Sequence, residues 1–348
     1  MRRSLLWFLW VLAGCEAATE EVSPGAGAPG VAADELRVPI QGRTFVHLGE
    51  RAVVGEGDPW DLAFEGYGAF TNSGPSGPGQ GAAFGPLGAG DFDRAVAIPF
   101  TTPDRSGGAF LDWYGYEGAP AHVLWSRFHT YAVRDGARLW KVQILGYYGQ
   151  IDGAPVTAVY RLRYAELTGA GSGPVVEVDT LDATAGGASA PASAPSSCLD
   201  LSSGAVLKLT PPEAAASNGW HLCFRRQNIA VNGGESGPRG VDAADLQAAE
   251  VAGETIPQLK ERSAASEEAR FLGIARSEAQ RAAFALDGVR SVFGSAWVDR
   301  SVEPPAPLPA SWVVVGADGQ RRYRVQFTRF EGTSALDPGT LFLRVRSE

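Results

Sequence analysis

The chain of 348 residues has little of the chemistry that enzymes and metal proteins use: three Cys, one Met and four His. No His-x-x-x-His or Cys-x-x-Cys spacing indicates a zinc site. Neither a Gly-x-Ser-x-Gly elbow nor a Gly-Lys-Ser/Thr phosphate loop is present. Three of the four His precede residue 130, which gives little support to a triad. We therefore expect that the protein is not an enzyme.

Positive charge is also in short supply, because 30 basic residues stand against 39 acidic ones, a formal net charge of −9. This balance gives no reason to expect a nucleic-acid partner. Turn formers and aromatics are abundant instead, with 44 Gly, 23 Pro, 9 Trp, 9 Tyr and 16 Phe. Such a composition predicts short strands separated by turns, and hence a mainly β fold.

The only long apolar run, Leu5 to Leu12, is too short to span a bilayer. Two arginines precede it and Leu-Ala-Gly-Cys ends it, as in a bacterial lipoprotein signal whose Cys becomes acylated. We expect residues 1–14 to be the signal peptide and Cys15 to carry the lipid. The alternative is an ordinary signal peptide that happens to contain a Cys. Residues 15–34 have few large apolar side chains and are expected to be a flexible tether.

The two remaining cysteines, Cys198 and Cys223, form an even pair in an exported chain. Export into an oxidising compartment favours disulfides. We therefore predict one disulfide between them.

The sequence repeats itself. Residues 60–78 and 220–238 share eight of nineteen positions at an offset of 160, including the leading Trp. Residues 135–149 align with 318–332 at an offset of 183. The 23 additional residues indicate an insertion in the second copy, and a period this long predicts two domains.

We place the first domain at 35–168 and the second at 198–348, with a Gly/Ala/Ser/Pro-rich linker at 169–197. The insertion, at about 243–289, is rich in Ala, Glu, Gln, Leu and Arg and is expected to be helical. The glycine-rich tail of the Trp motif, Asn72 to Gly79, is interpreted as a tight turn. Backbone amides in such a turn can also face a ligand carboxylate.

Several pieces of the first copy carry a family resemblance: Trp60 to Phe64, Thr71 to Gly79, Trp113 to Tyr116, Tyr131 to Gly136 and Lys141 to Tyr148. Their sequences, W-D-L-A-F, T-N-S-G-P-S-G-P-G, W-Y-G-Y, Y-A-V-R-D-G and K-V-Q-I-L-G-Y-Y, closely resemble those of the HmuY-like family of surface lipoproteins. The second copy resembles the family weakly. The resemblance implies two tandem HmuY-like antiparallel β domains, the second with the helical insertion, on a protein anchored by lipid at the outer membrane or cell surface.

The same resemblance implies haem (tetrapyrrole) binding between two axial side chains. Met1 leaves with the signal peptide and the two cysteines are expected to pair, so the candidate haem-binding residues are histidines or a Tyr. We nominate His122 and His129, which follow the aromatic segment 113–116, together with His47. His221 replaces Asp61 on a core strand and is expected to be structural.

The implied partners are haem or another small hydrophobic ligand, the membrane through the anchor, and an outer-membrane receptor. The competing hypothesis is a non-catalytic surface binding or structural lipoprotein that has lost haem ligation.

Overall fold

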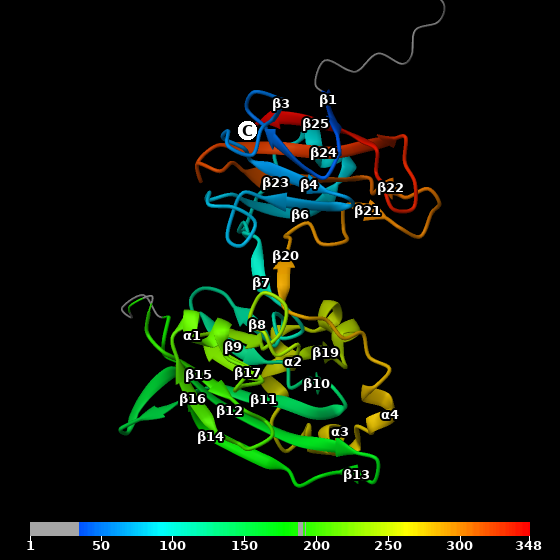
Figure 1. The fold of residues 1–348 in the computed structure, drawn as a ribbon. Helices are drawn as coiled ribbons and strands as arrows, with labels where there is room; N and C mark the ends of the chain where they lie inside the picture. The colour runs from blue at the N-terminus through cyan, green and yellow to red at the C-terminus, as the bar shows by residue number, and fades with distance from the viewer. Residues whose placement is uncertain (1–34, 187–190, 192) are drawn as a thin grey trace, which may run out of the picture.

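The structure is a computed structural model that describes residues 35–186, 191 and 193–348, and within them the fold is mainly β. The signal peptide, the tether and Cys15 lie outside the described residues. Figure 1 shows two groups of sheets joined by a narrow connector. We name them the terminal half (residues 35–104 and 291–348) and the central half (residues 108–287). The connector is the antiparallel pair β7 (Arg105–Gly107) and β20 (Gly288–Arg290).

The terminal half contains β1 (Glu35–Pro39), β2 (Arg43–His47), β3 (Ala52–Val54), β4 (Leu62–Glu65), β5 (Gly68–Thr71), β6 (Ala82–Gly88), η1 (Ala89–Asp93), β21 (Val298–Asp299), β22 (Ala306–Pro307), β23 (Ala310–Val315), β24 (Arg322–Glu331) and β25 (Thr340–Ser347). Its strands form a five-stranded sheet in the order β1-β25-β24-β23-β6, a four-stranded sheet in the order β3-β2-β4-β5, and the pair β21-β22.

The central half contains β8 (Tyr114–Glu117), β9 (Val123–Ser126), β10 (Thr130–Asp135), β11 (Arg138–Ile151), β12 (Ala154–Thr168), β13 (Gly171–Ser172), β14 (Val176–Asp182), β15 (Ser196–Leu199), β16 (Val206–Leu209), α1 (Pro211–Ala216), β17 (Leu222–Arg225), β18 (Asn228–Val231), β19 (Asp242–Asp245), η2 (Ala248–Gly253), α2 (Ile256–Glu261), α3 (Glu268–Gly273) and α4 (Arg276–Ala279). Its large sheet has the order β13-β12-β11-β10-β19, with β14 also paired to β12, and its small sheet the order β16-β15-β17-β18.

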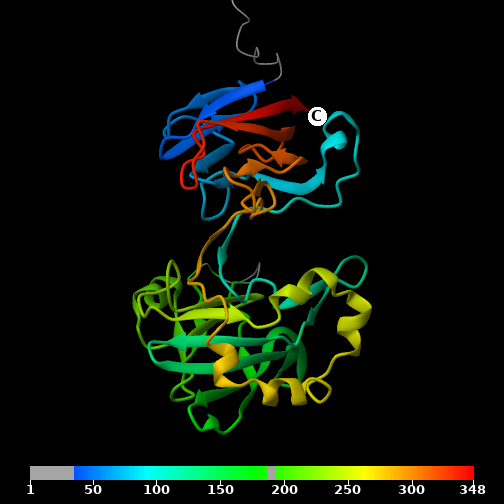
Figure 2. The ribbon, with the colours of Figure 1, turned by 90° about the vertical axis from the view of Figure 1, so that its right-hand side faces the viewer.

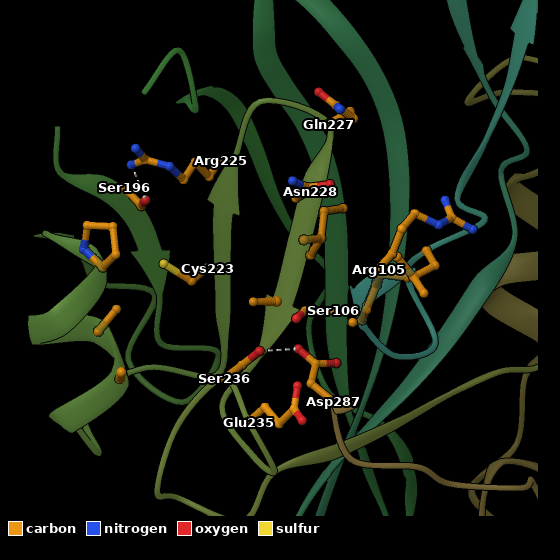
Figure 3. Close-up of a pocket in the computed structure, with 18 of the residues that line it drawn as sticks. Arg105, Ser106, Ser196, Cys223, Arg225, Gln227, Asn228, Glu235, Ser236 and Asp287 are labelled. Atoms are coloured by element: carbon orange, nitrogen blue, oxygen red, sulfur yellow. Dashed lines mark hydrogen bonds between the residues drawn. The ribbon is translucent and has the colours of Figure 1, made fainter. Parts of the chain in front are cut away.

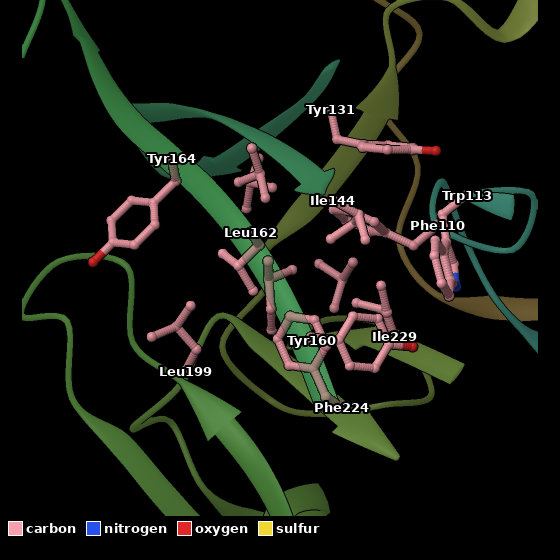
Figure 4. Packing of buried hydrophobic residues seen from close by; sticks show 14 of the residues in the cluster. Phe110, Trp113, Tyr131, Ile144, Tyr160, Leu162, Tyr164, Leu199, Phe224 and Ile229 are labelled. Atoms are coloured by element: carbon pink, nitrogen blue, oxygen red, sulfur yellow. The ribbon is translucent and has the colours of Figure 1, made fainter. Parts of the chain in front are cut away.

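Each half has its own hydrophobic core between a large and a small sheet. In the central half, Trp140, Val142 and Ile144 of β11 belong to one buried cluster with Phe224 and Ile229 of the small sheet. Figure 4 shows part of this cluster, including Ile144, Phe224 and Ile229. Trp140, Val142 and Ile144 alternate along β11 with Lys141 and Gln143, and these three apolar side chains share its core-facing side. A separate cluster that includes Leu62, Trp312 and Val325 fills the terminal half. Sheets stacked in this way bury the apolar face of each strand.

The expected helical insertion covers the outer face of the large central sheet, as Figure 2 shows in yellow. Lys141 on β11 donates from Nζ to the carbonyl of Leu272 at 3.1 Å, and the ring of Phe271 on α3 lies over both Lys141 and Arg163. This cover explains why Lys141 and Gln143 are fully buried on a face that would otherwise be solvated.

Strand pairing joins segments that the sequence assigned to different domains. β1 pairs with β25, and β6 pairs with β23, in the terminal half. β10 pairs with β19 in the central half. The expected division into 35–168 and 198–348 therefore does not match the sheets. Each half of the molecule takes its Trp motif from one copy and its last strands from the other.

The two copies nevertheless keep equivalent contacts. Asp104 Oδ2 accepts from the amide of Thr71 at 3.0 Å and from Ser76 Oγ at 2.6 Å. Its counterpart at an offset of 183, Asp287, accepts from the amide of Val231 and from Ser236 Oγ, both at 2.7 Å. The repeat is therefore visible in the structure as well as in the sequence.

The glycine-rich tail of the Trp motif folds back against Trp60. Asn72 donates from Nδ2 to the Trp60 carbonyl at 2.8 Å and accepts at Oδ1 from the amide of Gly79 at 2.9 Å. A Cβ on Gly77 would lie 2.3 Å from Asn72 Oδ1 and 2.6 Å from the Trp60 ring, so only glycine fits there. These contacts support the interpretation of the tail as a turn.

The expected linker, 169–197, begins too early. β13 and β14 lie within it and pair with β12. β14 contributes Val176, Val178 and Leu181 to this pairing, whereas β13 contributes only Gly171 and Ser172.

Within the described residues, no helix is both long enough and apolar enough to cross a membrane.

Candidate functional site

His129 is buried beside β10, and both of its ring nitrogens face carboxylates. Nδ1 lies 2.8 Å from Asp245 Oδ2, and Nε2 lies 3.0 Å from Glu254 Oε1. Ionised carboxylates only accept, so the geometry favours a ring that donates from both nitrogens and is positively charged. Such a ring has no lone pair for iron. The structure thus gives His129 a structural role that competes with haem ligation.

The surroundings of His129 explain its charge. Burial lowers the pKa of His129, but the hydrogen bonds and charges of Asp245 and Glu254 outweigh burial and raise the pKa above its usual value. Burial raises the pKa of Glu254, but His129, Arg127 and Arg262 outweigh it and lower the pKa to about 2. Arg127 and Arg262 lie 2.6 Å and 2.5 Å from the Glu254 carboxylate.

A metal centre at this place is poorly supported. His129, Glu250 and Glu254 bring ligand atoms within 4.8 Å of one another. However, Glu254 already faces two arginines and His129, and Glu250 pairs with Arg270. Because protein cations already balance these carboxylates, the cluster is best described as an ion-pair network around the buried His129, which holds Asp245 and Glu254 against the start of β10.

The other nominated histidines lie elsewhere. His47 ends β2 in the terminal half and accepts at Nδ1 from the amide of Glu50 at 3.0 Å. His122 lies on the exposed β8–β9 turn, where its Nδ1 hydrogen-bonds the Tyr116 hydroxyl. The structure therefore does not bring His47 together with His122 and His129.

In the second copy, His221 occupies the position of Asp61 and accepts an equivalent hydrogen bond. Its Nδ1 accepts from the amide of Leu201 at 3.1 Å, as Asp61 Oδ2 accepts from the amide of Leu48 at 2.8 Å. Burial and then Arg239 lower the pKa of His221 to about 4, so the ring is neutral near pH 7. These contacts agree with a structural role.

The segment 113–116 separates into a core part and a surface part. Trp113 is buried and donates from Nε1 to the carbonyl of Gln227 at 2.8 Å. Tyr114, Tyr116 and His122 line a recess of about 390 Å³ that also contains Tyr147 and Tyr148. We name it the aromatic recess.

A second cavity of about 300 Å³ adjoins the aromatic recess, since Tyr114 and Gln227 line both. It lies between α1, the β17–β18 hairpin and β7, and we name it the β18 pocket (Figure 3). Its apolar wall includes Phe110, Leu111 and Trp220. It combines segments of the two repeat copies, because β7 precedes the last strands of the first copy and β18 belongs to the second Trp motif.

Polar groups lie at opposite ends of the β18 pocket. Arg225 and Ser196 lie at one end, and Asp287 with Ser236 at the other (Figure 3). Asp287 Oδ1 is buried and has no hydrogen-bond partner among the described residues. Burial raises the pKa of Asp287, against the lowering effect of its hydrogen bonds to Val231 and Ser236. A pocket with an apolar wall and few polar groups is the usual form of a small-ligand site.

The disulfide between Cys198 and Cys223 is confirmed, with its sulfurs 2.01 Å apart, and Cys223 lines the β18 pocket. The pocket itself was not predicted. Its signal in the sequence was the loss of an aromatic residue between the copies, since Phe70 aligns with Ala230 at the offset of 160.

No protein-family model matches the chain, and no curated protein matches its sequence.

Proposed function

We propose that this chain is a lipid-tethered, non-catalytic surface protein of the HmuY-like type that binds a small hydrophobic ligand in its central half. The observation that carries the proposal is the pair of adjoining cavities, the β18 pocket and the aromatic recess, on one side of the central half. The buried histidines support a binding role over a catalytic one, because His129 and His221 are engaged by structural partners.

The tether rests on the Leu-Ala-Gly-Cys ending of the signal peptide. Acylation of Cys15 would hold the mature protein on a membrane although no described helix spans one. Cys15→Ala is expected to move the protein from membrane to soluble fractions when cells are fractionated, whereas Cys198→Ala is the control that keeps the anchor. Membrane association that survives Cys15→Ala would contradict the tether.

Haem is the second candidate, and the aromatic recess is where this chain would hold it. The Tyr116 hydroxyl and His122 Nδ1 hydrogen-bond at the rim, beside Tyr147 and Tyr148. A phenolate oxygen is a known axial ligand of haem iron, and a His that takes the phenol proton would favour it. His122 itself is the alternative ligand at the same place.

A haemin titration of the intact mature protein, followed by its absorption spectrum, tests the haem candidate. We expect one-to-one binding that Tyr116→Phe and His122→Ala each weaken at least tenfold, while His47→Ala in the terminal half leaves it unchanged. A spectrum that does not change at micromolar haemin would refute haem as the ligand. It would leave the β18 pocket as the site of another hydrophobic ligand.

A further inference from the structure

The two copies of the repeat differ most clearly at three paired positions on the small sheets. In the terminal half, Phe45, Ala63 and Phe70 lie side by side on β2, β4 and β5. In the central half the same register positions on β15, β17 and β18 hold Cys198, Cys223 and Ala230. Two aromatic rings are thus replaced by a disulfide and a methyl group.

In the terminal half the protein fills this place with its own rings. Phe45 packs against Trp60 with ring centroids 5.1 Å apart, and Phe70 joins the same cluster. The guanidinium of Arg43 lies 5.5 Å from the centroid of Phe70, within the range of a cation–π contact. The Phe70 ring therefore lies in a cluster with a Trp and within reach of an Arg.

In the central half, a Trp and an Arg again border this place, but no ring corresponds to that of Phe70. Trp220 corresponds to Trp60, is fully buried and donates from Nε1 to the Ala214 carbonyl at 3.0 Å. Arg225 lines the pocket and donates from Nη1 to Ser196 Oγ at 3.3 Å, and Ser196 occupies the position of Arg43. Where Phe70 would stand, Ala230 borders the 300 Å³ β18 pocket.

We propose that the β18 pocket binds the aromatic ring of a small molecule, seated where Phe70 lies in the other copy. This inference rests on the proposed binding function and names the chemical class of the ligand. A ring there would contact Trp220, the disulfide and the side chain of Arg225. The positively charged guanidinium of Arg225 suits the electron-rich face of an aromatic ring.

The test is a fluorine NMR titration of the intact mature protein with 4-fluorophenol. We expect saturable binding at one site, which Ala230→Phe weakens at least tenfold because the new side chain places the ring that the terminal half already has. Ala230→Leu fills the same space without an aromatic ring and should also weaken binding, so a folding defect in one variant does not decide the result. Unchanged binding in both folded variants would overturn the proposal.

The matched variant lies in the other copy. Phe70→Ala should open the equivalent place beside Trp60 and Arg43 and add a second 4-fluorophenol site. A folded Phe70→Ala protein without a second site would contradict the ring-for-ring correspondence on which the inference depends.

A competition experiment distinguishes a site for an aromatic ring from a site for any hydrophobic ligand of similar size. Phenol should displace 4-fluorophenol at a concentration at least fivefold lower than cyclohexanol, which has a similar size and no aromatic face. Equal displacement by the two would refute the aromatic class while leaving a hydrophobic ligand site in place. If neither 4-fluorophenol nor haemin binds at all, both the inference and the proposed function fail.

Discussion

At the scale of single residues, the charged state of His129 makes the stability of the protein depend on pH in a definite direction. Its folded pKa is raised above the value of about 6.5 expected in the unfolded chain. A raised pKa adds stability that is fully present below pH 6.5 and is lost as the pH rises through the folded pKa. His221 has the opposite effect on stability, and in a lower pH range. Because its folded pKa is about 4, the protein loses stability as the pH falls below 6.5 and this ring must take up a proton.

The free energy of unfolding in urea, measured from pH 5 to pH 9, should therefore fall above pH 6.5 in the natural protein. His129→Gln should flatten that fall and cost about 3 kcal/mol at pH 6, because it leaves Asp245 without its cation, while Glu254 keeps Arg127 and Arg262. The exposed His122→Gln is the control and should keep the natural slope. An unchanged slope in His129→Gln would contradict the assignment of a charged ring.

The residue types of the candidate site could be read from the sequence, but their partners could not. His122 was expected beside the aromatic segment 113–116, and it lies in the aromatic recess. The partners that occupy His129 are Asp245 and Glu254, which lie more than 100 residues further along the chain. No local pattern marks such a contact, because it depends on how β19 and η2 dock on β10.

At the scale of elements, most strands follow from local patterns. β10, β11 and β12 are consecutive antiparallel strands, and the first turn between them begins at Asp135-Gly136, a dipeptide typical of tight hairpin turns. The alternation of Trp140, Val142 and Ile144 with Lys141 and Gln143 fixed their faces. Helices were expected in about 243–289 from composition, and η2, α2, α3 and α4 lie there.

The pairing of those elements was beyond the sequence for a physical reason. In a duplicated chain, β6, which follows the first Trp motif, pairs antiparallel with β23, and its counterpart β19 pairs antiparallel with β10. Pairing within a copy and pairing between copies therefore bury equivalent apolar faces. Local hydrophobic patterns cannot distinguish them, because they describe which face is buried and not which strand covers it.

At the scale of the whole molecule, the exchange of segments between the copies is what creates the β18 pocket. Arg105 and Phe110, which lead into the last strands of the first copy, meet Trp220 and Ala230 of the second Trp motif. If each copy had closed on itself, these segments would not share a cavity. Each half of the molecule thus combines segments of both copies.

Cysteine cross-linking tests this exchange of segments between the copies. Glu35 on β1 is paired with Arg344 on β25, and the residue that corresponds to Arg344 in the first copy is Arg161 on β12. The exchanged arrangement predicts that Glu35→Cys with Arg344→Cys forms a disulfide under mild oxidation, detected by intact mass, and that Glu35→Cys with Arg161→Cys does not. Cross-linking of the 35/161 pair in place of the 35/344 pair would show that each copy closes on itself and would contradict the account.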